Sequence, residues 1–244
     1  MNYKAVLQYD GTRYRGWQTQ GNTDNTIQGK LETLLTKMAG EPVEVNGSGR
    51  TDAGVHAAGQ VISFRCKTKE SPEEICRYMN EYLPEDIAVL TVEEAAPRFH
   101  ARLNAVRKTY VYRIWNAPVR NVFRRRFTTW IQKPLDLEAM EQAATLLCGT
   151  HDYRVFCSLK KFKKSTVRTI EKIEIGKMGQ EIRISYTGDG FLYHMVRILT
   201  GTLVEVGLGL RKPEEMTEIL EGQDRTKAGR LMPPEGLTLE RVEY

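Results

Sequence analysis

Long apolar runs are missing from this sequence. No stretch approaches the roughly 18 consecutive apolar residues that a membrane helix needs, and the start, Met1 to Val6, lacks the apolar core of a secretory signal. Proline is scarce, with nine in 244 residues, while the hydrophobic fraction of 41% and the charged fraction of 27% are ordinary for globular proteins. We therefore expect a folded cytoplasmic protein with no membrane association.

Closely spaced cysteine and histidine residues are absent as well. The cysteines are Cys66, Cys76, Cys148 and Cys157, and the histidines are His56, His100, His151 and His194. No two cysteines form a Cys-x-x-Cys pair, and the histidines are far apart along the chain. Because zinc sites and disulfide frameworks usually show characteristic spacings, this pattern favours free thiols over either.

Positive charge is unevenly distributed. The net charge of +5 and the pI near 8.9 alone say little about partners. Between Arg98 and Lys172, however, there are 17 Lys and Arg against five Asp and Glu, so the rest of the chain is net negative. The basic charge is therefore concentrated in the middle of the chain.

Two clusters stand out within this basic region. One is Arg124-Arg125-Arg126, and in the other lysines flank Phe162. Such clusters suit a phosphate backbone, because each neutralised phosphate releases counterions. For either cluster by itself the alternative is a solvated charged loop, but two in one region favour nucleic acid. The lysines predicted to bind it are Lys160, Lys161, Lys163 and Lys164.

Hydrophobic periodicity predicts alternating strands and helices in the first half. Strands are expected over 3–9, 43–45 and 61–64, and a glycine-rich loop over 46–59. A helix begins at an Asn25–Gln28 capping box and ends at Gly40, and a second runs from Ser71 to Pro84.

A similar order recurs in the second half without clear identity of residues. Strands are expected over 109–115, 170–175 and 181–186, and helices over 136–147, 192–206 and 213–221. We therefore predict an α+β protein of two similar halves, residues 1–104 and 105–244, with flanking helices and a shared, largely antiparallel sheet, because several connections are too short for a parallel crossover. A cleft between the halves is expected if their sheets join edge to edge.

The segment from Gly47 to Ala57 is the most informative. Its glycines permit tight turns and close approach to a ligand. Between them lie a cation, a hydroxyl, a carboxylate and an imidazole, from Arg50, Thr51, Asp52 and His56. On composition alone, a glycine-rich turn in which Asp52 caps a backbone amide is favoured over a functional role.

The string at residues 49–57, GRTDAGVHA, closely resembles the signature of TruA-type tRNA pseudouridine synthases. Further matches to that family follow in order along nearly the whole chain. They are Asp10-Gly11-Thr12, Tyr14, Gly16-Trp17-Gln18, Phe99-His100-Ala101-Arg102, Lys108, Tyr110, Tyr112, Gly149-Thr150-His151-Asp152-Tyr153, Val167-Arg168-Thr169-Ile170, Gly190-Phe191-Leu192, Met195-Val196-Arg197 and Gly236-Leu237. Arg230-Leu231-Met232 departs from the family pattern, which puts the C-terminal packing in question.

The resemblance implies isomerisation of uridine to pseudouridine without a cofactor, a redox change or a metal. Asp52 is then the catalytic carboxylate, attacking the sugar or removing its 2′ proton. Arg197 is expected to keep Asp52 charged and positioned; its alternative is a surface salt bridge.

The same resemblance gives roles to three further residues. Tyr110 is expected to stack on the target uracil and to take the C5 proton; its alternative is a core aromatic on a strand. Arg50 is expected to fill the gap left by the extruded nucleotide, or simply to bind phosphate. For His56 a structural hydrogen bond is favoured over a catalytic dyad.

The family resemblance also implies a homodimer that binds tRNA and modifies positions 38, 39 and 40 of the anticodon stem-loop. The sequence argues against two other classes of function. A non-catalytic RNA chaperone is disfavoured by the presence of Arg50, Asp52, Tyr110 and Arg197. A metal-dependent nuclease usually needs several clustered carboxylates, whereas the core of this loop offers one.

Overall fold

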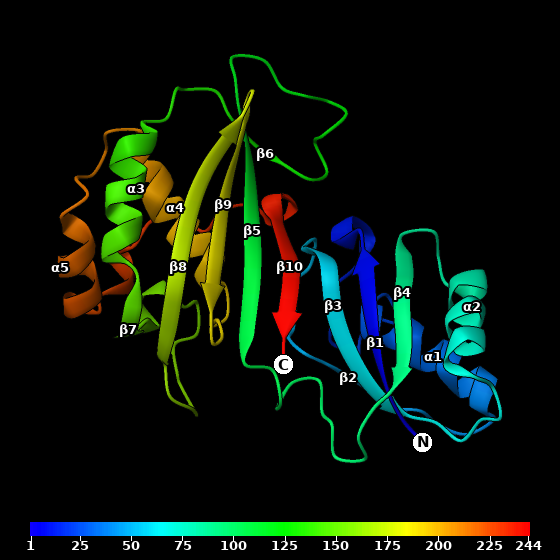
Figure 1. The fold of residues 1–244 in the computed structure, drawn as a ribbon. Coiled ribbons are helices and arrows are strands. Elements are labelled where there is room, and N and C mark those ends of the chain that lie inside the picture. The colour runs from blue at the N-terminus through cyan, green and yellow to red at the C-terminus, as the bar shows by residue number, and fades with distance from the viewer. The chain divides into compact units, whose positions relative to one another are not determined.

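Two units make up the computed structural model, which describes residues 1–244 (Figure 1). Unit 1 comprises Met1–Val106 and Thr238–Tyr244, and unit 2 comprises Arg107–Leu237. The sequence-based division at residue 104 assigned everything beyond it to the second half. The end of the chain instead packs in unit 1, where it adds a strand.

Unit 1 has a mixed sheet built around β3. Its strands are β1 (Asn2–Tyr9), β2 (Val45–Gly47), β3 (His56–Arg65), β4 (Ile87–Glu94) and β10 (Leu237–Glu243), of which Thr238 onward lies in this unit. β1 pairs antiparallel with both β3 and β4, and β2 pairs antiparallel with β3. β10 runs parallel to β3, with Thr238 opposite His56.

The expected loop over 46–59 is shorter than predicted at its C-terminal end. β3 begins at His56 rather than near Val61, because Ala57 already pairs with Tyr9 of β1. Side chains on β1 alternate as strand geometry requires, with Tyr3, Ala5, Leu7 and Tyr9 buried in the core.

Helices α1 (Ile27–Ala39) and α2 (Pro72–Tyr82) complete unit 1, with α2 lying beside the edge strand β4 (Figure 1). The predicted capping box at Asn25 was wrong. Thr26 caps α1 by accepting from the Gly29 amide at 3.2 Å, because the Asn25 amide donates to the Arg13 carbonyl instead. The capping box at Ser71 is confirmed, with reciprocal bonds between Ser71 and Glu74.

Unit 2 contains mainly antiparallel strands. Its strands are β5 (Arg107–Asn116), β6 (Thr129–Ile131), β7 (Gly149–Asp152), β8 (Val167–Met178) and β9 (Glu181–Gly188). β9 lies between β5 and β8, β7 lies outside β8, and all these pairs are antiparallel. β6 adds a short parallel pairing to β5.

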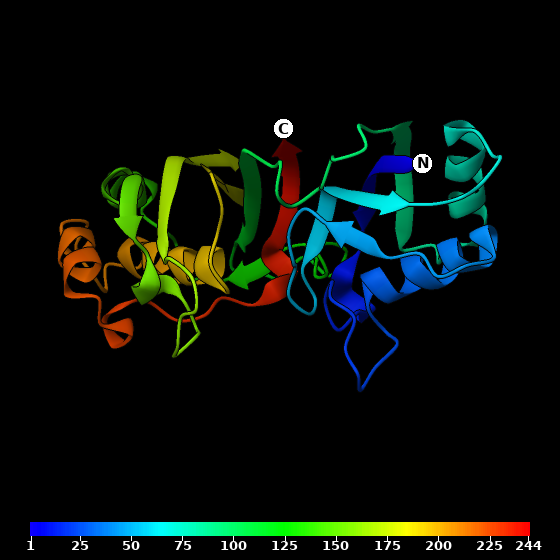
Figure 2. The same cartoon turned by 90° about the horizontal axis from the view of Figure 1, so that it is seen from below.

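Helices α3 (Leu137–Leu146), α4 (Met195–Gly207) and α5 (Glu215–Gly222) also belong to unit 2 (Figure 2). α4 is buried along most of its length. It begins three residues later than the predicted 192–206 helix, because His194 has a left-handed backbone with φ of 66° that a right-handed helix cannot contain. Four short 3₁₀ helices complete the chain: η1 (Gly11–Arg13), η2 (Arg154–Phe156), η3 (Arg225–Lys227) and η4 (Pro234–Gly236).

The α+β prediction with largely antiparallel pairing is confirmed, with β3–β10 and β5–β6 as parallel exceptions. All four cysteines are free thiols. None of the helices has the length and apolarity of a membrane span.

Candidate active site

The predicted catalytic aspartate lies on the segment Ser48–Val55 between β2 and β3, which we call the aspartate loop. Its first residues are tied to β3. The Ser48 amide donates to the Val61 carbonyl at 2.8 Å. The buried Gln60 side chain accepts from the Ser48 hydroxyl at 2.6 Å and donates to the Gly49 carbonyl at 2.9 Å. The start of the loop therefore has a fixed position on the sheet.

Thr51 is the central anchor of the aspartate loop. Its buried hydroxyl lies 2.8 Å from the hydroxyl of Tyr9, and its carbonyl accepts from the Trp17 amide at 3.0 Å. Burial raises the pKa of Tyr9 to about 12, so this phenol stays neutral and keeps its hydroxyl proton for hydrogen bonding. Because hydrogen bonds hold both the side chain and the backbone carbonyl of Thr51, its two neighbours along the chain are held in place as well.

Those neighbours, Arg50 and Asp52, differ in exposure. Arg50 is exposed and Asp52 is half-buried. The Asp52 carbonyl accepts from the Val55 amide at 3.1 Å, which closes a turn at Gly54, where φ is 78°. The loop thus presents a cation and a carboxylate on either side of a buried threonine.

The N-terminal motif packs directly on this loop, a contact that sequence periodicity did not reveal. A Cβ at Gly11 would lie 2.0 Å from the Val55 carbonyl oxygen, and a Cβ at Gly47 would lie 2.6 Å from the Trp17 ring. At Gly16, φ is +94° and a Cβ would lie 2.8 Å from the Thr51 carbonyl oxygen. Glycine is required at these positions because a side chain would displace the aspartate loop.

His56 makes the structural hydrogen bond that its position in the motif favoured. The buried ring accepts from the Gly11 amide through Nδ1 at 3.0 Å. Asp10 Oδ1 lies 3.2 Å from the same nitrogen.

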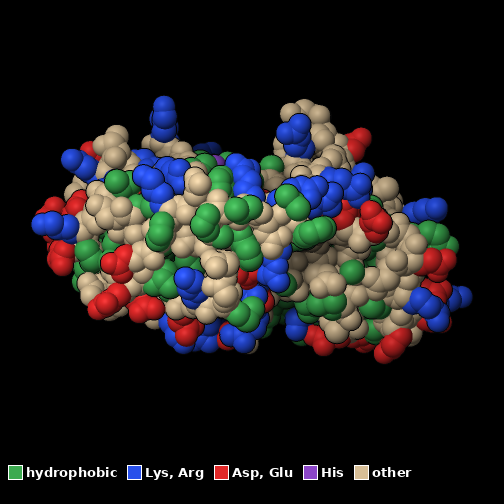
Figure 3. Space-filling model, turned by 90° about the horizontal axis from the view of Figure 1, so that it is seen from above, with side chains coloured by type: hydrophobic (Ala, Val, Ile, Leu, Met, Phe, Trp, Pro, Cys, Tyr) green, Lys and Arg blue, Asp and Glu red, His purple; other side chains and the backbone are tan.

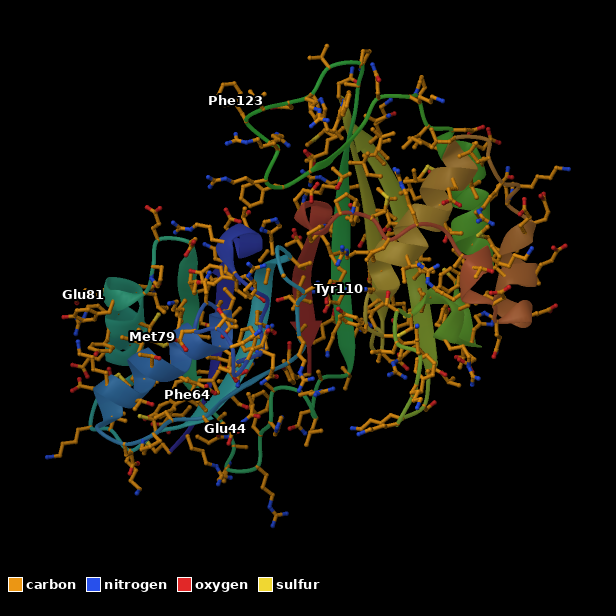
Figure 4. All side chains as sticks on the ribbon, turned by 180° about the vertical axis from the view of Figure 1, so that it is seen from behind. Glu44, Phe64, Met79, Glu81, Tyr110 and Phe123 are labelled. Atoms are coloured by element: carbon orange, nitrogen blue, oxygen red, sulfur yellow. The ribbon has the colours of Figure 1, made fainter.

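In unit 2, Tyr110 lies on β5 directly opposite Tyr186 of β9 (Figure 4). Its buried ring meets Phe191 edge to face, with centroids 5.2 Å apart and an interplanar angle of 82°. This contact restricts the tilt of the phenol.

Arg197 lies on the first turn of α4 and is 8% exposed. Its Nε donates to the Met232 carbonyl at 2.7 Å, and the Met232 amide donates back to the Arg197 carbonyl at 3.3 Å. The segment that departs from the family pattern therefore packs closely on α4. Gly201 shows the same closeness, since a Cβ there would lie 1.9 Å from the Arg230 carbonyl oxygen.

Tyr110 and Arg197 lie on the same face of the unit 2 sheet. Tyr112, two residues along β5, points to the same side as Tyr110. Its hydroxyl donates to the Pro233 carbonyl at 2.7 Å, beside the Met232 carbonyl that Arg197 binds. Burial raises the pKa of Tyr112, and the nearby charge of Arg197 opposes that rise.

The arginine cluster lies on the segment Ala117–Phe127, which projects between β5 and β6 (Figure 1). Arg124 and Arg183 both pair with Glu181, which is 2% exposed. Burial opposes ionisation of Glu181, but these two arginines outweigh it and lower its pKa. Arg124 is therefore an anchor of the segment, while the 94% exposed Phe123 forms its tip (Figure 4).

Basic and hydrophobic side chains lie side by side on the face from which this segment projects (Figure 3). The lysine cluster belongs to a different segment, Ser158–Ser165, which we call the lysine loop. Lys160, Lys161, Lys163 and Lys164 are all exposed, as a role in phosphate binding needs. The loop follows the buried Cys157 and ends before Thr166, whose hydroxyl donates to Asp152 at 2.6 Å.

The side chains that could bind a metal do not cluster in this structure. No group of three or more His, Cys, Asp or Glu residues is placed to hold an ion. A surface hollow in unit 1 is lined by residues that include Asn2, Arg65 and Glu94, and by none of the predicted site residues.

Comparison with known proteins identifies the class to which this geometry belongs. A family model described as tRNA pseudouridine synthase matches residues 5–104 and 143–244. The chain therefore belongs to the tRNA pseudouridine synthase family.

Curated relatives match over almost the full length. The chain is 47% identical to tRNA pseudouridine synthase A of Bacillus sp. (strain KSM-64), covering 100% of this chain and 99% of that protein. It is 46% identical to tRNA pseudouridine synthase A of Brevibacillus brevis, covering 99% and 98%. A chain in a crystal structure of a Cbf5-Nop10-Gar1 complex matches 97% of this chain over 48% of its own length. The sequence identity is 11% and the TM-score is 0.40, so this likeness is too weak to carry an argument.

Proposed function

We propose that this protein isomerises uridine to pseudouridine at positions 38, 39 and 40 of the tRNA anticodon stem-loop, in the cytoplasm and without a cofactor or metal. The observation that carries the proposal is the aspartate loop, in which Thr51 and Gln60 hold a half-buried Asp52 inside the family's signature. Full-length similarity to proteins named tRNA pseudouridine synthase A supports the choice of substrate.

The reaction rearranges bonds within one nucleotide. The bond from ribose C1′ to uracil N1 breaks, the base turns, C5 joins C1′, and the proton on C5 is finally lost while N1 gains one. The Asp52 carboxylate acts in one of two ways, by attacking C1′ or by removing the 2′ proton to give a glycal. Either role requires an ionised Asp52, and so a positive charge that stabilises it.

Arg197 is proposed to supply that charge, because a guanidinium stays protonated at any working pH. The hydrogen bond from Arg197 to the Met232 carbonyl limits the positions that its guanidinium group can take. Tyr110 is proposed to stack on the uracil and to accept the C5 proton, a role that suits a phenol whose tilt is set by Phe191.

Binding of the RNA is proposed to depend on Arg50 and on the lysine loop. Flipping a nucleotide out of its stack costs a few kcal/mol, which an inserted side chain offsets, and the exposed Arg50 adjoins Thr51, next to Asp52. The lysines would bind the phosphate backbone through charge and shape rather than base sequence. We propose a homodimer in which one tRNA spans both subunits.

Replacement of Asp52 by Asn tests the central assignment. Asp52→Asn is expected to abolish pseudouridine formation on tRNA while tRNA affinity stays within about tenfold, because the residue acts in the chemistry. Glu221→Gln, an equal charge change at an exposed position on α5, is the matched control and is expected to keep full activity. Turnover by Asp52→Asn contradicts the catalytic role, and modification outside the anticodon stem-loop contradicts the assigned positions.

A further inference from the structure

The residue before α4 has an unusual backbone. His194 and Gln223 are the two non-glycine residues with positive φ, at 66° and 51°. Such a conformation is disfavoured for residues with a Cβ and persists where surrounding contacts enforce it. Gln223 simply follows α5, at its exposed C-terminal cap. His194 instead lies where α4 begins, three residues before Arg197.

The ring of His194 does not cap the helix. Its side chain makes no hydrogen bond to the first turn of α4, although its carbonyl accepts from the Ile198 amide at 3.0 Å. Nδ1 lies 2.8 Å from the Ser158 hydroxyl, and the ring stacks on Tyr193 with centroids 3.7 Å apart. The Ser158 amide also donates to the Tyr193 carbonyl at 3.4 Å. The strained turn therefore directs the imidazole toward Ser158, not toward the helix.

Ser158 is the first residue of the lysine loop. Through its amide and its hydroxyl it binds both residues that precede α4, so this end of the loop is docked on the beginning of the helix. Arg197 follows His194 by three residues, within the first turn of α4. The contact between Ser158 and His194 thus joins the lysine loop, which is proposed to bind phosphates, to α4, the helix that carries Arg197, the proposed partner of Asp52.

We propose that His194 is a positioning residue that fixes the lysine loop to the start of α4. RNA held by the lysines is then kept in a set register with Arg197. The inference rests on the proposed function, because fixing the lysine loop matters for catalysis only if the lysines bind the tRNA. A glycine would adopt the same turn with less strain, so the imidazole is there for its contacts with Ser158 and Tyr193.

Three variants separate the effect of the imidazole ring from the effect of the left-handed backbone turn. His194→Gly keeps the left-handed turn and removes both contacts, His194→Asn tolerates that turn and retains a side chain that can hydrogen-bond to Ser158, and Ser158→Ala removes only the hydroxyl. Gln223→Gly is the matched control, because it makes the same kind of backbone change away from the lysine loop. Each is compared with the wild type for single-turnover pseudouridine formation, tRNA affinity, melting temperature and tryptic cleavage within the lysine loop.

His194→Gly is expected to melt at or above the wild-type temperature, to be cleaved faster within the lysine loop, and to lose about tenfold or more in kcat/KM for tRNA, as expected for misplaced binding groups. Ser158→Ala is expected to show the same changes to a smaller degree. His194→Asn is expected to recover most of the activity, and Gln223→Gly to behave as the wild type.

Wild-type kinetics and unchanged cleavage in His194→Gly would overturn the inference. So would a fall in melting temperature matched by the loss of activity, because that pattern marks a residue needed only for folding. An inactive wild type overturns the proposed function instead. In that case the affinity and cleavage measurements still decide whether His194 fixes the lysine loop.

Discussion

Gly11 offers a quantitative test of how tightly the aspartate loop is positioned. In Gly11→Ala the new Cβ would begin 2.0 Å from the Val55 carbonyl oxygen, and ordinary contact starts at 3.4 Å. Gly11 and Val55 must therefore move apart by about 1.4 Å. Because φ at Gly11 is not positive, alanine itself fits the local conformation, and the cost comes from this contact. Asp52 shares a turn with Val55 and is expected to move with it.

The expected losses follow from that displacement. Overpacking of this kind typically costs about 1–3 kcal/mol of folding free energy, and a misplacement near 1 Å at a catalytic group can reduce the rate by about 100-fold. We expect a lower melting temperature and a single-turnover rate reduced by roughly that factor. Affinity for tRNA should fall much less than the rate, because the lysine loop belongs to unit 2 and only Arg50 shares the displaced loop.

Gly21→Ala is the matched control for this experiment. It makes the same chemical change in unit 1, but a Cβ at Gly21 meets nothing within 4 Å. Its rate and melting temperature are expected to equal those of the wild type. If Gly11→Ala kept its rate within about twofold of Gly21→Ala, the claim that packing at Gly11 sets the position of Asp52 would be refuted.

Three other perturbations have definite expected outcomes. Neutralising the four lysines of the lysine loop together should weaken tRNA binding and lower the slope of log affinity against log salt by up to about 3; an unchanged slope excludes them from the interface. Glu181→Gln should cost about 1.5–3 kcal/mol of stability, measured by denaturant unfolding. Because the folded pKa of Glu181 is lowered, its stabilisation is complete above the unfolded value near 4.5 and is lost as the pH falls through the folded value, so the variant should lose stability less steeply in acid. Tyr110→Phe keeps the ring and removes the hydroxyl, so tRNA affinity should persist while product formation falls, as followed by release of tritium from C5.

Local patterns in the sequence were sufficient where neighbours along the chain decide the structure. The strand-forming residues over 3–9 and the capping box at Ser71 predicted their elements correctly. At the start of α1, both Asn25 and Thr26 are good capping residues, and the choice was made by a carbonyl at Arg13 that no local pattern indicates. β6 escaped prediction because three residues carry too little periodicity.

The site shows the same division between local and long-range information. Its motif residues were all visible in the sequence as a family resemblance, and their proposed roles remain predictions. What the sequence did not reveal was how they are held. Thr51 is fixed by Tyr9 and Trp17, and Arg197 by Met232, and each of these contacts joins residues more than 30 positions apart. Glu181 likewise is buried despite its charge because Arg124, 57 positions away, pairs with it together with its near neighbour Arg183.

The parallel pairing of β10 with β3 has a consequence for biosynthesis. The start of β3, which follows the aspartate loop, gains a second neighbour beside β1 only when Thr238 and Leu239 have been made and pair with His56 and Ala57. A nascent or truncated chain that ends before Thr238 would expose an unpaired edge of β3, and exposed edges recruit strands from other chains. Folding of unit 1 is thus completed only after β10 has been made, and truncation before Thr238 should yield aggregation rather than a stable fragment.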